Sequence, residues 1–240
     1  MSRGQSHVVG VVVLLGVAVA SLALVTAGVG TVVQHTATRA DAARATAGLE
    51  DALRPVETTG VHVAAVPFAD GRLRTANRSV RVLGPDGPVL DVPTDALVFD
   101  SGEQGVTAVA GAVVVRGPGR ARVERGFPVT ASPSVLVLGV ARVEGRMDVA
   151  SNGAGTGVRL RTNVSHRRRD LGPGRYRLAV ETRSASALAR YYRDRWRRDG
   201  GNVTVAVRDF DGDGIPSVVL GFPEARHAYL VSHRVGVSRA

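Results

Sequence analysis

The sequence predicts an α+β protein: a long N-terminal transmembrane helix, then a mainly antiparallel β-rich domain with one inserted amphipathic helix. Three observations lead to this prediction. Residues 4–38 contain no Lys, Arg, Asp or Glu. After Pro55, apolar and polar residues alternate with a period of two in several segments, as in half-buried strands. One segment, Ser184–Asp199, has helical spacing instead.

The uncharged run predicts the first helix. Val8–Val33 is predominantly apolar, and about 20 apolar residues at 1.5 Å each span the roughly 30 Å hydrocarbon core of a bilayer. Alanines at helical spacing continue the helix over residues 34–53, until Pro55 disfavours helical backbone at the residue before it. We therefore expect a transmembrane helix over residues 5–54 and a β-rich extracellular domain over residues 55–240.

The first residues, Met1-Ser2-Arg3-Gly4, form a short basic head directly before the apolar run. Here the chain resembles the type IV pilin-like precursors of archaea, and more narrowly an uncharacterised haloarchaeal family of pilin-like membrane proteins. The stretches Thr94–Gly102 and Ala225–Val237 also fit that family. The resemblance implies a class III signal peptide, with residues 1–4 as its leader. It further implies that a prepilin peptidase recognises Arg3 and Gly4 and cleaves before Gln5.

Two other interpretations of the apolar segment stay open. Ala18-Val19-Ala20 before Ser21 fits the cleavage site of an ordinary secretory signal, and an uncleaved anchor needs no site at all. The arginines after the apolar run, Arg39, Arg44 and Arg54, count against an exported C-terminal domain under the positive-inside rule. Because large domains cross largely regardless of that rule, we expect a single-pass protein of the cell membrane with its C-terminal domain outside.

Composition limits the chemistry more than it defines it. There is no Cys, which excludes disulfides and thiol catalysis. All 31 basic residues are Arg, and the net charge is +10. A solvated Arg-rich surface is the simplest explanation, and attraction to an acidic surface, anionic lipid or nucleic acid is the functional alternative. This basic charge conflicts with the acidic exterior expected of a protein from a halophile.

The segments of the β-rich domain are separated by Gly and Pro turns. Alternation is clearest in Val158–Val164, Tyr176–Val180 and Val203–Val207, whereas Ala112–Val115 and Ser134–Val140 are continuous apolar runs typical of central strands. About ten strands are expected in the roughly 185 residues after Pro55, enough for one antiparallel sandwich or folded sheet with its own core.

Two basic clusters have both a structural and a functional interpretation. In Ser184–Asp199 the residues Leu188, Tyr192 and Trp196 fall on one helical face, which predicts packing on the sheet with the arginines in water. The alternative is a nucleic-acid surface, because aromatic and basic residues alternate there. His166–Arg169 is expected to be an exposed basic turn, and a contact with phosphate or a partner is the alternative.

The sharpest chemical motif lies in residues 209–214. Asp209, Asp211 and Asp213 with Gly214 match the first half of a calcium-binding loop. Position twelve of such a loop is normally a bidentate Glu, but here it is Leu220. A hairpin turn is therefore the main expectation, a weak calcium site is the alternative, and no other cofactor is expected.

Three sequons, at Asn77, Asn163 and Asn202, are candidate glycosylation sites if the domain is exported. The sequence contains no nucleophile elbow, phosphate-binding loop, zinc-protease motif or dinucleotide fingerprint, and we expect no enzyme activity.

The expected function is structural: a subunit or minor component of a type IV pilus-like surface filament or secretion-type assembly, anchored by the N-terminal helix. The expected partners are membrane lipid, the prepilin peptidase and other pilin-like subunits, but not nucleic acid. The alternative function is a membrane-tethered ectodomain that binds an extracellular ligand without polymerising.

Overall fold

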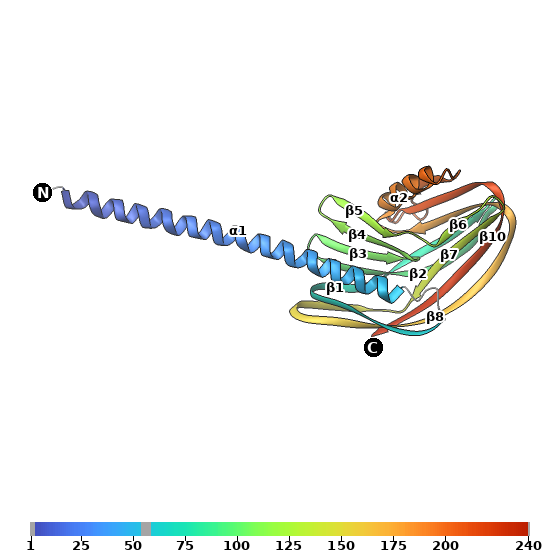
Figure 1. Ribbon diagram of the computed structural model, residues 1–240, viewed down its shortest axis with the longest axis horizontal. Coiled ribbons are helices and arrows are strands. Elements are labelled where there is room, and N and C mark those ends of the chain that lie inside the picture. Colours follow the sequence, from blue (N-terminus) through green and yellow to red (C-terminus); the bar gives the residue numbers. More distant parts are fainter. Residues whose placement is uncertain (1–2, 54–58, 240) are drawn as a thin grey trace. The chain divides into compact units, whose positions relative to one another are not determined.

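The computed structural model describes residues 3–53 and 59–239 and contains two helices and ten strands in those ranges (Figure 1). The helices are α1 (Arg3–Leu53) and α2 (Ala185–Arg198). The strands are β1 (Gly60–Gly84), β2 (Gly87–Ser101), β3 (Gln104–Val109), β4 (Ala112–Gly117), β5 (Arg120–Arg125), β6 (Val129–Ala131), β7 (Val135–Glu144), β8 (Asp148–Glu181), β9 (Thr204–Arg208) and β10 (Ser217–Arg239).

The chain forms two compact units. The first comprises Met1–Ala40 and the second Asp41–Ala240. Helix α1 is continuous across this boundary, so its last residues, Asp41–Leu53, belong to the second unit together with all ten strands. We call the second unit the β unit.

The predicted transmembrane helix over residues 5–54 is wrong. Among the residues that the structure describes, none of the helices combines the length and the apolar character that crossing a bilayer requires. The last residues of α1, Asp41–Leu53, belong to the β unit instead. The same finding overturns the predicted single-pass membrane localisation with an extracellular C-terminal domain.

The predicted α+β class is also wrong, because the fold is mainly β. Segments expected to be separate strands and turns merge into long strands: β1 has 25 residues, β8 has 34 and β10 has 23. The expected basic turn at His166–Arg169 lies inside β8, where it pairs with Leu230–His233 of β10. Local polarity predicted a turn there, but backbone hydrogen bonding to β10 decides the conformation.

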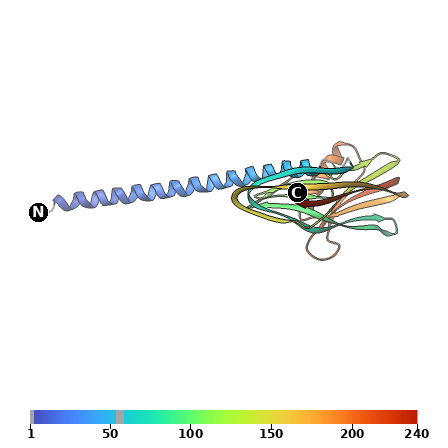
Figure 2. The same ribbon diagram turned by 90° about the horizontal axis from the view of Figure 1, so that it is seen from below.

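Five strands of the β unit pair in a closed circuit. Strand β8 pairs with β1 and with β10, β10 pairs in parallel with β7, and β1 pairs with β2. The circuit closes where Asp95 of β2 pairs with Val143 of β7, and the Val143 N–H donates to Thr94 Oγ1 at 3.1 Å. Figure 2 accordingly shows the strands in layers above one another rather than in one flat sheet. The strands β3, β4 and β5 extend outward from β2.

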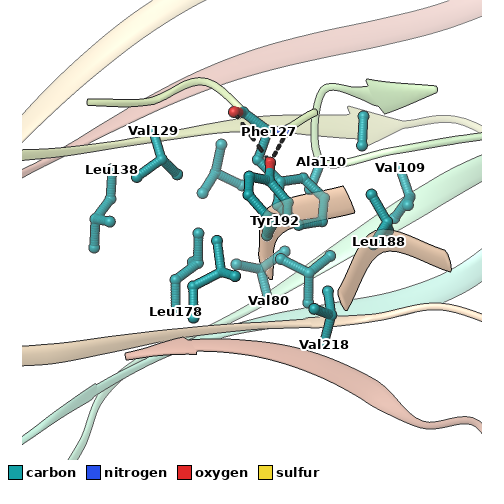
Figure 3. Close-up of a cluster of buried hydrophobic side chains, with 14 of the residues drawn as sticks. Val80, Val109, Ala110, Phe127, Val129, Leu138, Leu178, Leu188, Tyr192 and Val218 are labelled. Carbon is teal, nitrogen blue, oxygen red and sulfur yellow. Dashed lines mark hydrogen bonds between the residues drawn. The ribbon is translucent and has the colours of Figure 1, made fainter. Parts of the chain in front are cut away.

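One hydrophobic core of the β unit packs the strands against α2. Helix α2 contributes Leu188, Tyr192 and Trp196, all buried, which confirms the predicted packing face of this segment. The Tyr192 hydroxyl accepts a hydrogen bond from the Phe127 N–H and donates to the Phe127 carbonyl oxygen at 3.3 Å (Figure 3). Burial raises the pKa of Tyr192, so the hydroxyl keeps the proton that it donates.

A second core packs the strands against the end of α1. Ala45, Leu49 and Leu53 are buried among side chains of β1, β2, β7, β8 and β10. The helix lies so close to β1 that a Cβ atom on Gly48 would stand 2.6 Å from the carbonyl oxygen of Ala65. Glycine at this position therefore allows a helix–strand approach that a larger residue would prevent.

Asp41 connects α1 to β1. Its side chain is almost fully buried and accepts hydrogen bonds from the Ala69 N–H at 2.9 Å and the Asp70 N–H at 3.0 Å. Arg44 Nη2 lies 2.6 Å from the same carboxylate. Burial alone would raise the pKa of Asp41, but the two backbone donors and Arg44 outweigh it and hold the pKa below its ordinary value.

Candidate functional site

The most unusual surface of the first unit is an apolar stretch of α1. Leu14, Leu15, Val17, Val19 and Leu22 expose between 60% and 72% of their surface. All residues of Leu14–Ala23 are exposed, and we call this stretch the exposed apolar segment. Exposed apolar area of this extent marks an interaction site on most soluble proteins.

The exposed apolar segment is uncharged and narrow at one position. Gly16 and Ala20 are four residues apart, so they lie on the same side of the helix. A Cβ atom added to Gly16 would meet nothing within 4 Å, which means that a larger side chain there would not disturb its own chain. Small residues spaced in this way let two helix backbones approach closely.

The predicted calcium motif folds as a turn whose carboxylates already have partners. The Asp209 carboxylate accepts the N–H groups of Asp211, Gly212 and Gly214 at 3.2, 2.9 and 3.1 Å. Asp213 Oδ1 accepts the Ile215 N–H at 2.8 Å. In the described ranges no group of three or more His, Asp or Glu side chains is arranged to hold a metal ion. The calcium site stays a prediction.

Asp211 is directed away from the turn toward β1. Its Oδ2 lies 2.6 Å from Arg81 Nη2, and Arg81 also pairs with Asp91 of β2 at 3.1 Å. Arg81 is mostly buried, whereas both carboxylates are about half exposed. The Asp209–Gly214 loop is thus tied to the β1–β2 ladder through one guanidinium group.

Removing the Asp209 side chain tests whether it caps the turn. We expect Asp209→Ala to lower the free energy of unfolding by about 1 kcal/mol, as loss of a helix N-cap does, because three N–H groups lose their acceptor. Asp213→Ala serves as the control and should have a smaller effect, since one N–H group is involved. The measurement is the free energy of unfolding of both variants in urea, with and without calcium. Equal stability of Asp209→Ala and the parent would contradict the capping role.

The remaining sequence-predicted sites are dispersed. Asn77 in β1, Asn163 in β8 and Asn202 before β9 are all exposed, but the first two lie within paired strands rather than in surface loops. Arg3, Gly4 and Gln5 form the first residues of α1, and Met1 and Ser2 of the predicted leader lie outside the described residues. Glycosylation and leader cleavage stay predictions.

Sequence reasoning missed a basic groove of about 520 Å³ in the β unit. Four arginines from three strands line it: Arg142 of β7, Arg167 and Arg169 of β8, and Arg234 of β10. The sequence contains only part of the pattern that forms this groove. Ser165, Arg167 and Arg169 alternate along β8, but their clustering with Arg142 and Arg234 depends on the pairing of β8, β10 and β7.

The fold is that of a mainly β protein with a long N-terminal helix. Residues 3–238 match the family of unknown function DUF7289, and the chain belongs to that family. No curated protein and no solved structure matches the chain. The resemblance to archaeal type IV pilin-like proteins therefore stays a prediction.

Proposed function

We propose that the protein is a structural subunit that assembles with other copies of the same chain through the N-terminal part of α1. The observation that carries this proposal is the exposed apolar segment. The segment carries no charge and Ser21 is its one polar residue, and a helix that is apolar all round is normally buried. The segment therefore needs partners that cover its apolar surface.

A second copy of the same helix is a suitable partner. Residues 4–38 carry no charged side chain, so two such segments can pack without burying a charge. Identical chains always supply this surface at the same concentration, and most oligomers are built from identical subunits. Gly16 and Ala20 offer a place of close approach, and Leu15 and Leu22, seven residues apart, lie on one side of the helix.

The length of α1 bears on the kind of assembly. Its first 38 residues, Arg3–Ala40, lie outside the β unit and extend roughly 57 Å at 1.5 Å per residue. Packed helices of this length would form the centre of a filament or secretion-type assembly. The β unit has two cores of its own. Each subunit would add this unit to the assembly besides its packed helix. The role is structural, with no catalytic step.

The proposal predicts that the purified full-length chain is oligomeric in aqueous buffer and that Leu15→Glu with Leu22→Glu makes it monomeric. Two carboxylates within the helix contact would have to be desolvated without partners. The measurement is sedimentation velocity over a range of micromolar concentrations. Gly16→Leu should also weaken assembly, since it fills the place of close approach without touching its own chain.

The matched control is Val61→Glu with Val63→Glu in β1. These two valines expose 52% and 59% of their surface, so the change in charge and in exposed apolar area is similar. This variant should assemble like the parent. A parent chain that is monomeric at all concentrations, or equal loss of assembly in both double variants, would refute the proposal. The first outcome would favour a ligand-binding protein that does not assemble.

A further inference from the structure

The basic groove holds more positive charge than its own residues neutralise. Arg142 and Arg234 are direct register partners on β7 and β10. Glu144 lies between them, with its Oε1 at 3.0 Å from Arg142 Nε and 3.1 Å from Arg234 Nε. Like charges directly opposite each other on neighbouring strands repel. Here a single carboxylate forms ion pairs with both guanidinium groups.

The other two arginines of the groove add to this excess. Arg167 and Arg169 are two residues apart on β8 and therefore point to the same face of the strand. Within the described ranges neither guanidinium group has an ion pair, and both side chains are exposed. Four guanidinium groups and one carboxylate leave a net charge of about +3 among these five residues, counted with their ordinary charges at neutral pH.

The inner wall of the groove is apolar. Leu230 of β10 is buried there, and Val92 of β2 is half-buried. Leu230 pairs in register with Arg169, so an apolar and a cationic residue stand side by side. A volume of about 520 Å³ falls within the range of small-molecule sites.

The geometry points to the groove as a binding site for an amphipathic anion: a carboxylate, sulfate or phosphate group joined to a short apolar body. Guanidinium groups bind such oxyanions through paired N–H donors, and a bound anion would relieve the repulsion among the four arginines. The apolar body would cover Val92 beside the buried Leu230, which distinguishes this ligand from a simple inorganic ion. The site is independent of α1 and of the proposed assembly.

The test uses the full-length protein and isothermal titration calorimetry with four probes. Octyl phosphate and octanoate carry both features, inorganic phosphate lacks the apolar body, and octanol lacks the charge. We expect saturable binding of at least one of the first two with one site per chain. Inorganic phosphate and octanol should each bind about ten-fold more weakly or worse, since each forgoes one class of contact.

Variants then locate the site. Arg167→Gln with Arg169→Gln should weaken binding of the anionic amphiphile about ten-fold or more, because hydrogen bonds between charged groups are lost. The control is Arg159→Gln with Arg161→Gln, two exposed arginines of the same strand outside the groove. This control should bind like the parent, and it also accounts for amphiphile adsorbed on α1. Equal weakening in both double variants would overturn the inference. So would inorganic phosphate or octanol that binds as tightly as octyl phosphate.

Discussion

Replacing Tyr192 by Ala is expected to lower the free energy of unfolding by about 3–5 kcal/mol, the range found for buried aromatic residues cut back to Ala. Tyr192 is 1% exposed, stacks on Phe127 with ring centroids 5.6 Å apart, and lies in the core that joins α2 to the strands. The loss therefore combines transfer of a large side chain to water, a cavity and a broken ring contact.

Tyr192→Phe separates the contribution of the hydroxyl group to stability from that of the aromatic ring. It leaves the buried Phe127 N–H without its acceptor, and we expect a loss of about 1–3 kcal/mol. Arg190→Ala, an exposed change on the same helix, should stay within about 0.5 kcal/mol of the parent. The single Trp of the chain, Trp196, lies in the same core, so its fluorescence follows urea unfolding directly. A Tyr192→Ala variant as stable as the parent would show that α2 is not part of the cooperative fold.

Removing the Asp41 carboxylate is expected to destabilise the protein by about 2–6 kcal/mol, since two partly buried N–H groups lose their acceptor at roughly 1–3 kcal/mol each. The Asp41→Ala variant leaves the Ala69 and Asp70 N–H groups unpaired where α1 meets β1. Asp41→Asn keeps one acceptor oxygen and should lose less. Glu50→Gln, a change to another carboxylate of the same helix, is the control and should cost no more than about 0.5 kcal/mol.

The Asp41 contribution should also depend on pH. Its pKa in the folded protein is lower than its ordinary value of 3.8, so the unfolded chain binds the proton more readily than the folded one. The stabilisation is therefore complete above the unfolded pKa and declines as the pH falls through the lower folded pKa. We expect the stability difference between the parent and Asp41→Asn to be constant at neutral pH and to shrink below about pH 4. A difference that grows on acidification would contradict this assignment.

Local patterns in the sequence predicted several elements for definite physical reasons. Alternation with a period of two marks segments such as Val158–Val164, because one face of a strand is buried and the other is wet. Apolar spacing of 3–4 residues with a Gly stop marks the helix that became α2. Turn residues did not end β8 at Gly172-Pro173-Gly174, where pairing with β10 continues past a register shift.

The sequence by itself determined the positions of strand-like and helix-like segments, the uncharged run of residues 4–38, the positive charge and the absence of thiol chemistry, since these depend on residue type and spacing alone. Only the tertiary structure decided that Asp41–Leu53 belongs to the β unit, that five strands close a circuit, and that Arg142, Arg167, Arg169 and Arg234 meet in one groove. The physical reason is that these features depend on which distant strands exchange backbone hydrogen bonds. One residue's own preference does not specify that choice, because the partner strand supplies half of every contact.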